Sequence, residues 1–197
     1  MHLILDIFQG VGIAVAVGIR PFLPALLVGA LAAGDVQIDF KGTDFSFLQG
    51  APFLLGMVLG AVVVAFAERR LRSEGSAARR RFTLVLAAAG LALGALEFAG
   101  ALAQDHYATW PGLIAGVACA ALGAVATAPL LARARARLDA AAAAAIPLFA
   151  DGAGMAAAVL SVLLPGVGII IAALLGWMLL AGRRREGEKY AGLRILR

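Results

Sequence analysis

The sequence predicts an all-α membrane protein with about six transmembrane helices, including two proline-broken helical hairpins. Of its 197 residues, 62% are hydrophobic and 15% are charged, whereas a soluble domain is nearer half apolar and a quarter charged. The basic residues cluster between apolar blocks, as in cytoplasmic loops of membrane proteins. We therefore expect one polytopic domain over residues 1–182 and a basic cytoplasmic tail at 183–197. The apolar blocks lie at about 3–33, 51–67, 82–103, 111–131 and 142–182.

The first block is too long for one crossing and contains the segment GIRPFLP. Its 31 residues would form a helix of about 46 Å, against a hydrocarbon core of about 30 Å. Pro21 and Pro24 are expected to break this helix, because proline removes a backbone donor. Two interpretations follow. The block is either a hairpin with Arg20 at an inner turn, or one kinked helix with Arg20 near the middle of the membrane.

The three middle blocks each have the length of a single crossing. The connectors 68–81 and 133–139 are strongly basic and are expected in the cytoplasm. The connectors 34–50 and 104–110 are acidic or nearly neutral and are expected outside. The three helices then alternate correctly between the two sides of the membrane.

The last block must return to the side from which it starts, because basic segments lie on both sides of it. We predict a turn in its LLPGVG segment, with the break from Leu164 to Gly166, since Pro165 followed by glycine suits a tight reversal. The first and last blocks also share a G-x-G start, at Gly10 and Gly152, and a later proline. This likeness is consistent with an inverted repeat of the kind found in transporters, or with shared Gly/Ala-rich composition alone.

Four polar side chains inside the blocks are candidate binding residues, because such groups are costly at membrane depth. They are Gln9, Arg20, Glu97 and Asp151. Arg20 either reaches the cytoplasmic headgroups, or acts with the amide groups freed at Pro21 to bind an anion or a lipid phosphate. Glu97 either reaches the membrane interface or pairs structurally, for example with Arg20, and Asp151 is either a cap or kink partner near Pro147 or a counter-ion of Arg20. Alternatively, these carboxylates face a cavity and bind a proton or cation.

No catalytic or metal-binding motif is present. His2 and His106 lie away from any carboxylate cluster, and Cys119 is the single cysteine, so no metal site, cofactor or intrachain disulfide is predicted. An enzyme is therefore not expected.

Three segments together resemble the bacterial integral membrane proteins of the domain of unknown function 4126 family. They are GIRPFLPALLVGALAAG, ALEFAGALAQD and LIAGVACAALGAVATAPLLARARARL. The first, with the small-residue helix before it, is similar to the family's N-terminal signature. The resemblance implies a polytopic bacterial membrane protein and no established activity.

We predict a multi-pass protein of the bacterial inner membrane that acts as a transporter or channel for a small ion, or that binds an anionic lipid headgroup. The alternative is a scaffold or accessory subunit that packs through Gly/Ala-rich helix faces. Expected partners are membrane lipids, with anionic headgroups at the basic loops, and a small ion or anionic ligand. A homo-oligomer fits either function, and nucleic acid is not an expected partner.

Overall fold

The computed structural model describes residues 2–71 and 76–191. These residues form seven α-helices and one short 3₁₀ helix, and none of them is in a strand. Six of the α-helices are long and apolar enough to cross a membrane, which confirms the predicted fold class. The elements are α1 (His2–Ile19), α2 (Phe22–Ala33), η1 (Ser46–Gln49), α3 (Ala51–Arg70), α4 (Ser76–Ala103), α5 (Trp110–Arg137), α6 (Ala140–Leu163) and α7 (Pro165–Ala191).

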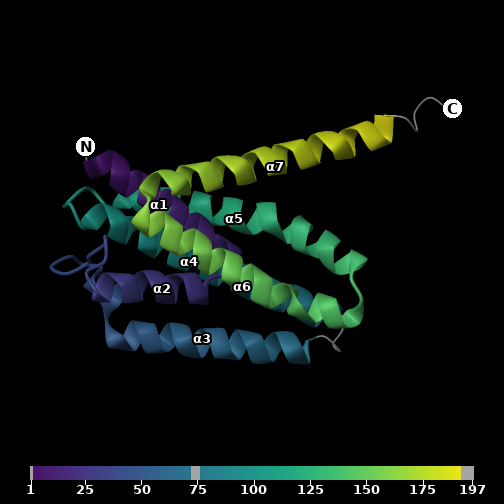
Figure 1. Cartoon of the computed structure of the whole chain (residues 1–197), viewed down its shortest axis with the longest axis horizontal. Helices are drawn as coiled ribbons and strands as arrows, with labels where there is room; N and C mark the ends of the chain where they lie inside the picture. Colours follow the sequence, from purple (N-terminus) through teal and green to yellow (C-terminus); the bar gives the residue numbers. More distant parts are fainter. Residues whose placement is uncertain (1, 72–75, 192–197) are drawn as a thin grey trace.

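Helix α1 is the centre of the bundle (Figure 1) and packs against α4, α5, α6 and α7. Its middle residues, Ile13 to Val17, are completely buried. Helix α3 lies at the edge, where it packs against α2 and η1 and buries none of its residues. The bundle is therefore built around the first helix of the chain, and α3 is its most loosely attached member.

Glycine residues let α1 approach its neighbours closely. A Cβ atom on Gly18 would lie 2.1 Å from the carbonyl oxygen of Ala120, and one on Gly123 would lie 2.2 Å from that of Val15. In a bilayer, helices associate through such close van der Waals contact, because lipid tails are as apolar as the side chains. Glycine therefore lets the backbones of α1 and α5 come into direct contact.

The first apolar block forms a hairpin. Helix α1 ends at Ile19, Arg20 and Pro21 form a bend, and α2 runs back from Phe22. The break falls at Pro21, which cannot donate a backbone hydrogen bond. Pro24 lies in the first turn of α2, where amide groups have no partner within the helix and proline is tolerated. The prediction that Pro24 is also a break is therefore wrong.

The turn of this hairpin lies inside the bundle. Helices α1 and α4 run antiparallel, and Gly90 lies against Gly18. The same register places Arg20 level with Ala88, seven residues or about 10 Å from the basic stretch at 79–81. The first block is therefore a hairpin, as in the first interpretation, but its Arg20 lies below the surface of the bundle.

The last apolar block also forms a hairpin. Helix α6 ends at Leu163, Leu164 is non-helical, and α7 begins at Pro165. This confirms the predicted turn, but Gly166 lies in α7 and the break is shorter than predicted, because proline is well suited to the first position of a helix. The return helices of the two hairpins differ, with 12 residues in α2 and 27 in α7. The inverted repeat therefore stays a prediction.

The connector between α2 and α3 packs its apolar side chains into one end of the bundle. Phe40 and Leu48 are completely buried there. The backbone N–H of Lys41 donates to Asp39 Oδ1 at 2.8 Å. The side chain of Lys41 donates to Asp35, and this hydrogen bond raises the pKa of Lys41. The connector is thus an ordered cap on the bundle.

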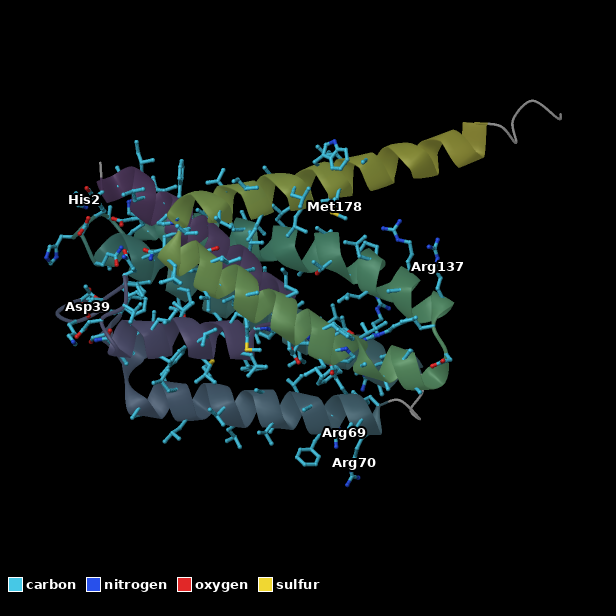
Figure 2. All side chains as sticks on the ribbon, in the orientation of Figure 1. His2, Asp39, Arg69, Arg70, Arg137 and Met178 are labelled. Carbon is cyan, nitrogen blue, oxygen red and sulfur yellow. The ribbon has the colours of Figure 1, made fainter. Side chains whose placement is uncertain are left out.

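Charged residues are divided between the two ends of the bundle (Figure 2). His2 and Asp39 lie at one end, whereas Arg69, Arg70 and Arg137 lie at the opposite end. The first end carries the connectors predicted to be outside, and the second carries those predicted to be cytoplasmic. Within the predicted cytoplasmic segments, residues 72–75 and 192–197 lie outside the described residues.

Labelling of introduced cysteines tests this orientation. In a Cys119→Ala background, we expect Asp44→Cys to react with a membrane-impermeant thiol reagent added to intact cells. Leu138→Cys should react only after the membrane is permeabilised, because the basic end is retained inside. Both positions are exposed at opposite ends of the bundle. Reaction of both from the same side would overturn the predicted orientation.

Candidate ion-binding cluster and cavities

Three charged side chains meet at the turn between α1 and α2. Nη1 and Nη2 of Arg20 donate to the two carboxylate oxygens of Glu68 at 2.6 and 3.4 Å. Nε of Arg20 lies 2.9 Å from Oδ1 of Asp151, an ion pair that lacks hydrogen-bond geometry. The side chains of Arg20, Glu68 and Asp151 are 9%, 19% and 27% exposed. We call these three residues the Arg20 cluster.

The sequence identifies Asp151 as a partner of Arg20, but it does not identify Glu68. Asp151 is a predicted partner of Arg20, and α6 carries it there. Gly154 favours this approach, because a Cβ atom on it would lie 3.1 Å from Cγ of Pro24, tighter than an ordinary contact. Glu68 was missed, because the sequence places it in the basic connector 68–81. Helix α3 continues to Arg70 and so carries Glu68 past the end of its apolar block. The available signal for this pairing was the single acidic residue, Glu68, that directly follows the apolar block.

Glu97 is buried away from the Arg20 cluster. Its side chain is fully buried, and neither carboxylate oxygen has a hydrogen-bond partner. Its neighbour Phe98 packs on Gly10, which places Glu97 level with Val11, nine residues or about 14 Å along α1 from Arg20. The predicted pairing of Glu97 with Arg20 is therefore wrong, because the two side chains lie at different depths.

Gln9 belongs to a separate polar network near the opposite end of the bundle. Its Nε2 donates to the carbonyl oxygens of Gln37 at 3.2 Å and Val162 at 3.4 Å. Gln104 Nε2 donates to Gln9 Oε1 at 3.2 Å and to Asp6 Oδ1 at 2.8 Å. Gln9 thus joins α1 to the α2–α3 connector, to the end of α4 and to the end of α6. These contacts favour a structural role for Gln9.

One cavity lies between the basic ends of α3, α4, α5 and α6. Its volume is about 470 Å³, within the usual range for ligand pockets. The cavity extends from the basic ends of these helices to the α1–α2 turn at Pro21. Three arginines and one glutamate supply its charged lining: Arg20, Arg79, Arg135 and Glu68. The charge of the lining is therefore predominantly positive.

The second cavity lies between α3 and α6, on the other side of the Arg20 cluster. Its volume is about 290 Å³, and its lining is mostly apolar. Among the described residues, no Cα atom of α3 comes within 8 Å of one in α6. Arg20, Pro21, Glu68 and Pro147 line both cavities. The Arg20 cluster therefore separates an arginine-rich cavity from an apolar crevice.

Metal binding finds no support in the described part of the chain, where no group of three or more His, Cys, Asp or Glu side chains could hold an ion. Comparison of the chain with known protein families, with curated proteins and with solved structures found no match. The resemblance at GIRPFLP thus stays a prediction. The six apolar helices identify the chain as a candidate multi-pass membrane protein.

Proposed function

We propose that this multi-pass membrane protein is a transporter of the bacterial inner membrane, and that it binds a small anion at its basic end. The observation that carries the proposal is the cavity of about 470 Å³ with three arginines and one glutamate in its lining. A water-accessible cavity with an excess of one charge concentrates ions of the opposite charge. Guanidinium groups also bind phosphate and carboxylate groups through two parallel hydrogen bonds.

Arg20 is the deepest cation of this site, and its position favours an exchange of partners. Glu68 already occupies two of its nitrogens. An anion that reaches Arg20 must therefore displace the Glu68 carboxylate. Because α3 packs only against α2 and η1 among the described elements, loss of this ion pair would free the basic half of α3 to move. Ligand binding would then favour a second conformation through its different affinity for the two states.

Flux measurements test the proposal. Purified protein in liposomes is expected to carry radiolabelled inorganic phosphate inward faster than empty liposomes do. Arg135→Gln should reduce this flux about 10- to 100-fold, because a hydrogen bond to a charged group contributes about 1.5–3 kcal/mol. The matched control is Arg133→Gln, on the same helix but not in the cavity lining, where Nε donates to the Pro129 carbonyl oxygen. We expect it to retain the flux.

Two results would contradict the proposal. One is phosphate movement no faster than in empty liposomes, although the protein is folded. The other is an equal loss of flux in Arg133→Gln and Arg135→Gln, which would indicate a general effect of helix-end charge.

The alternative is a scaffold that holds a partner helix, and one observation favours it. Helix α3 is apolar on all sides and buries no residue, with Leu55, Leu59 and Phe66 all more than 60% exposed. A second membrane helix could pack there without displacing any contact of the chain. A scaffold needs no ligand in the cavity, so the absence of phosphate flux in the experiment above would favour it.

A further inference from the structure

The crevice lies between α3 and α6, beside the first residues of α2, a helix that packs against both of them. Its walls include Phe22, Ala61, Val64, Ala65 and Leu148. Both helices are candidate membrane spans, and their Cα atoms stay more than 8 Å apart throughout the described residues. Within a bilayer, a gap between two spanning helices is reached by lipid chains rather than by water. The crevice therefore suits an apolar occupant.

The crevice and the arginine-rich cavity share one wall. Arg20, Pro21 and Glu68 line both spaces, as do Ala144 and Pro147. A single molecule could then place a charged group on one side of the Arg20 cluster and a hydrocarbon chain on the other. Such a molecule must be amphiphilic, with an anionic head and an apolar tail.

The distribution of charge fixes which end of the ligand lies where. Arg79 and Arg135 line only the larger cavity, beside Arg20. In the crevice, Arg20 and Arg69 are balanced by Glu68 and Asp151, and the remaining walls are apolar. An anionic head therefore belongs in the larger cavity, and a hydrocarbon chain belongs in the crevice.

We propose that the ligand is a membrane lipid with a phosphate headgroup, which enters sideways between α3 and α6. Its phosphate contacts Arg20 in the larger cavity, and one acyl chain occupies the crevice. This inference rests on the proposed anion site and names its substrate class. The headgroup must pass the Arg20–Glu68 ion pair on its way to the larger cavity. When phosphate replaces the Glu68 carboxylate on Arg20, this ion pair breaks and the crevice opens towards the larger cavity.

Binding to lipid-stripped protein in dodecyl maltoside tests the proposal. The probes are dioleoyl phosphatidic acid, inorganic phosphate and dioleoyl glycerol, which carries the same chains without phosphate. We expect phosphatidic acid to bind at least tenfold more tightly than either of the other probes, measured by native mass spectrometry and by microscale thermophoresis. Only this ligand reaches both spaces.

The variant Ala65→Phe fills the crevice and leaves every charge in place. It should weaken binding of phosphatidic acid at least tenfold and leave binding of inorganic phosphate unchanged. Gly56→Phe is the matched control. It adds the same ring to α3 nine residues away, on the opposite face of the helix, where a Cβ atom meets nothing within 4 Å. It should bind both probes as the wild-type protein does.

The outcomes separate this inference from the function on which it rests. If inorganic phosphate binds as tightly as phosphatidic acid, or if Ala65→Phe changes neither, the lipid proposal is wrong and the anion site stands. If neither phosphate compound binds to folded protein, both proposals are wrong. Equal binding of dioleoyl glycerol and phosphatidic acid would leave an apolar chain site without headgroup recognition, which also overturns the inference.

Discussion

Arg20→Ala is expected to cause the largest loss of stability among single charge substitutions in the chain. Removing the guanidinium leaves Glu68 and Asp151 facing each other without a cation, in a region where the three side chains are mostly buried. Removing one partner of a buried ion pair typically costs about 3–5 kcal/mol. We expect a lower midpoint of thermal unfolding in detergent, measured by fluorescence-detected size-exclusion chromatography.

Matched variants identify the cause of this loss. Arg20→Lys should recover part of the stability, because an ammonium group keeps the charge but not the planar pair of hydrogen bonds to Glu68. Adding Glu68→Gln and Asp151→Asn to Arg20→Ala should recover more, since no unpaired carboxylate remains. If Arg20→Ala is as stable as the wild-type protein, the cluster does not hold α3 and the exchange mechanism is contradicted.

Gly123→Leu is expected to prevent stable packing of the bundle. A Cβ atom at this position would lie 2.2 Å from the Val15 carbonyl oxygen, and a backbone atom cannot move aside as the end of a side chain can. Overpacking of a core costs about 1–3 kcal/mol and occasionally more, and the upper end is expected where α1 and α5 must separate. The folded fraction after detergent extraction should fall sharply.

The control for this variant is Gly176→Leu, at which a Cβ atom meets nothing within 4 Å. The added side chain faces open space on α7 and should leave the folded yield unchanged. Similar losses in both variants would mean that leucine at these glycines disturbs membrane insertion rather than the contact between α1 and α5.

The sequence predicted features that depend on local chemistry. Proline broke both long blocks, at Pro21 and next to Pro165, because it cannot donate in the middle of a helix. Long apolar runs and clustered arginines predicted the helices and the charge difference between the two ends. Each of these signals is contained within a few neighbouring residues.

Pairings between distant residues could not be predicted in the same way. Glu68 is 48 residues from Arg20, and its pairing depends on how far α3 extends beyond its apolar block. One alternative paired Glu97 with Arg20, but the antiparallel register of α1 and α4 places it at another depth. Asp6 lies close to a chain end, and nothing in the sequence indicated its hydrogen bond to Gln104. The depth of each polar group follows from helix packing, which one sequence does not specify.

The short apolar stretch of α1 also affects the distance over which a membrane voltage falls within the protein. The ten residues of α1 between Gln9 and Arg20 carry no polar side chain. Gln9 and Arg20 are eleven positions apart, or about 16 Å along the helix, whereas a hydrocarbon core is about 30 Å thick. At the basic end, the arginine-rich cavity reaches Arg20, so the solution potential of that side would extend to this depth. A membrane voltage would therefore fall over less than the full thickness of the hydrocarbon core, and each unit charge that crosses it would exchange about 2.3 kcal/mol per 100 mV. Glu97 of α4 lies level with Val11 of this stretch, so its carboxyl group would lie within the region over which the voltage falls.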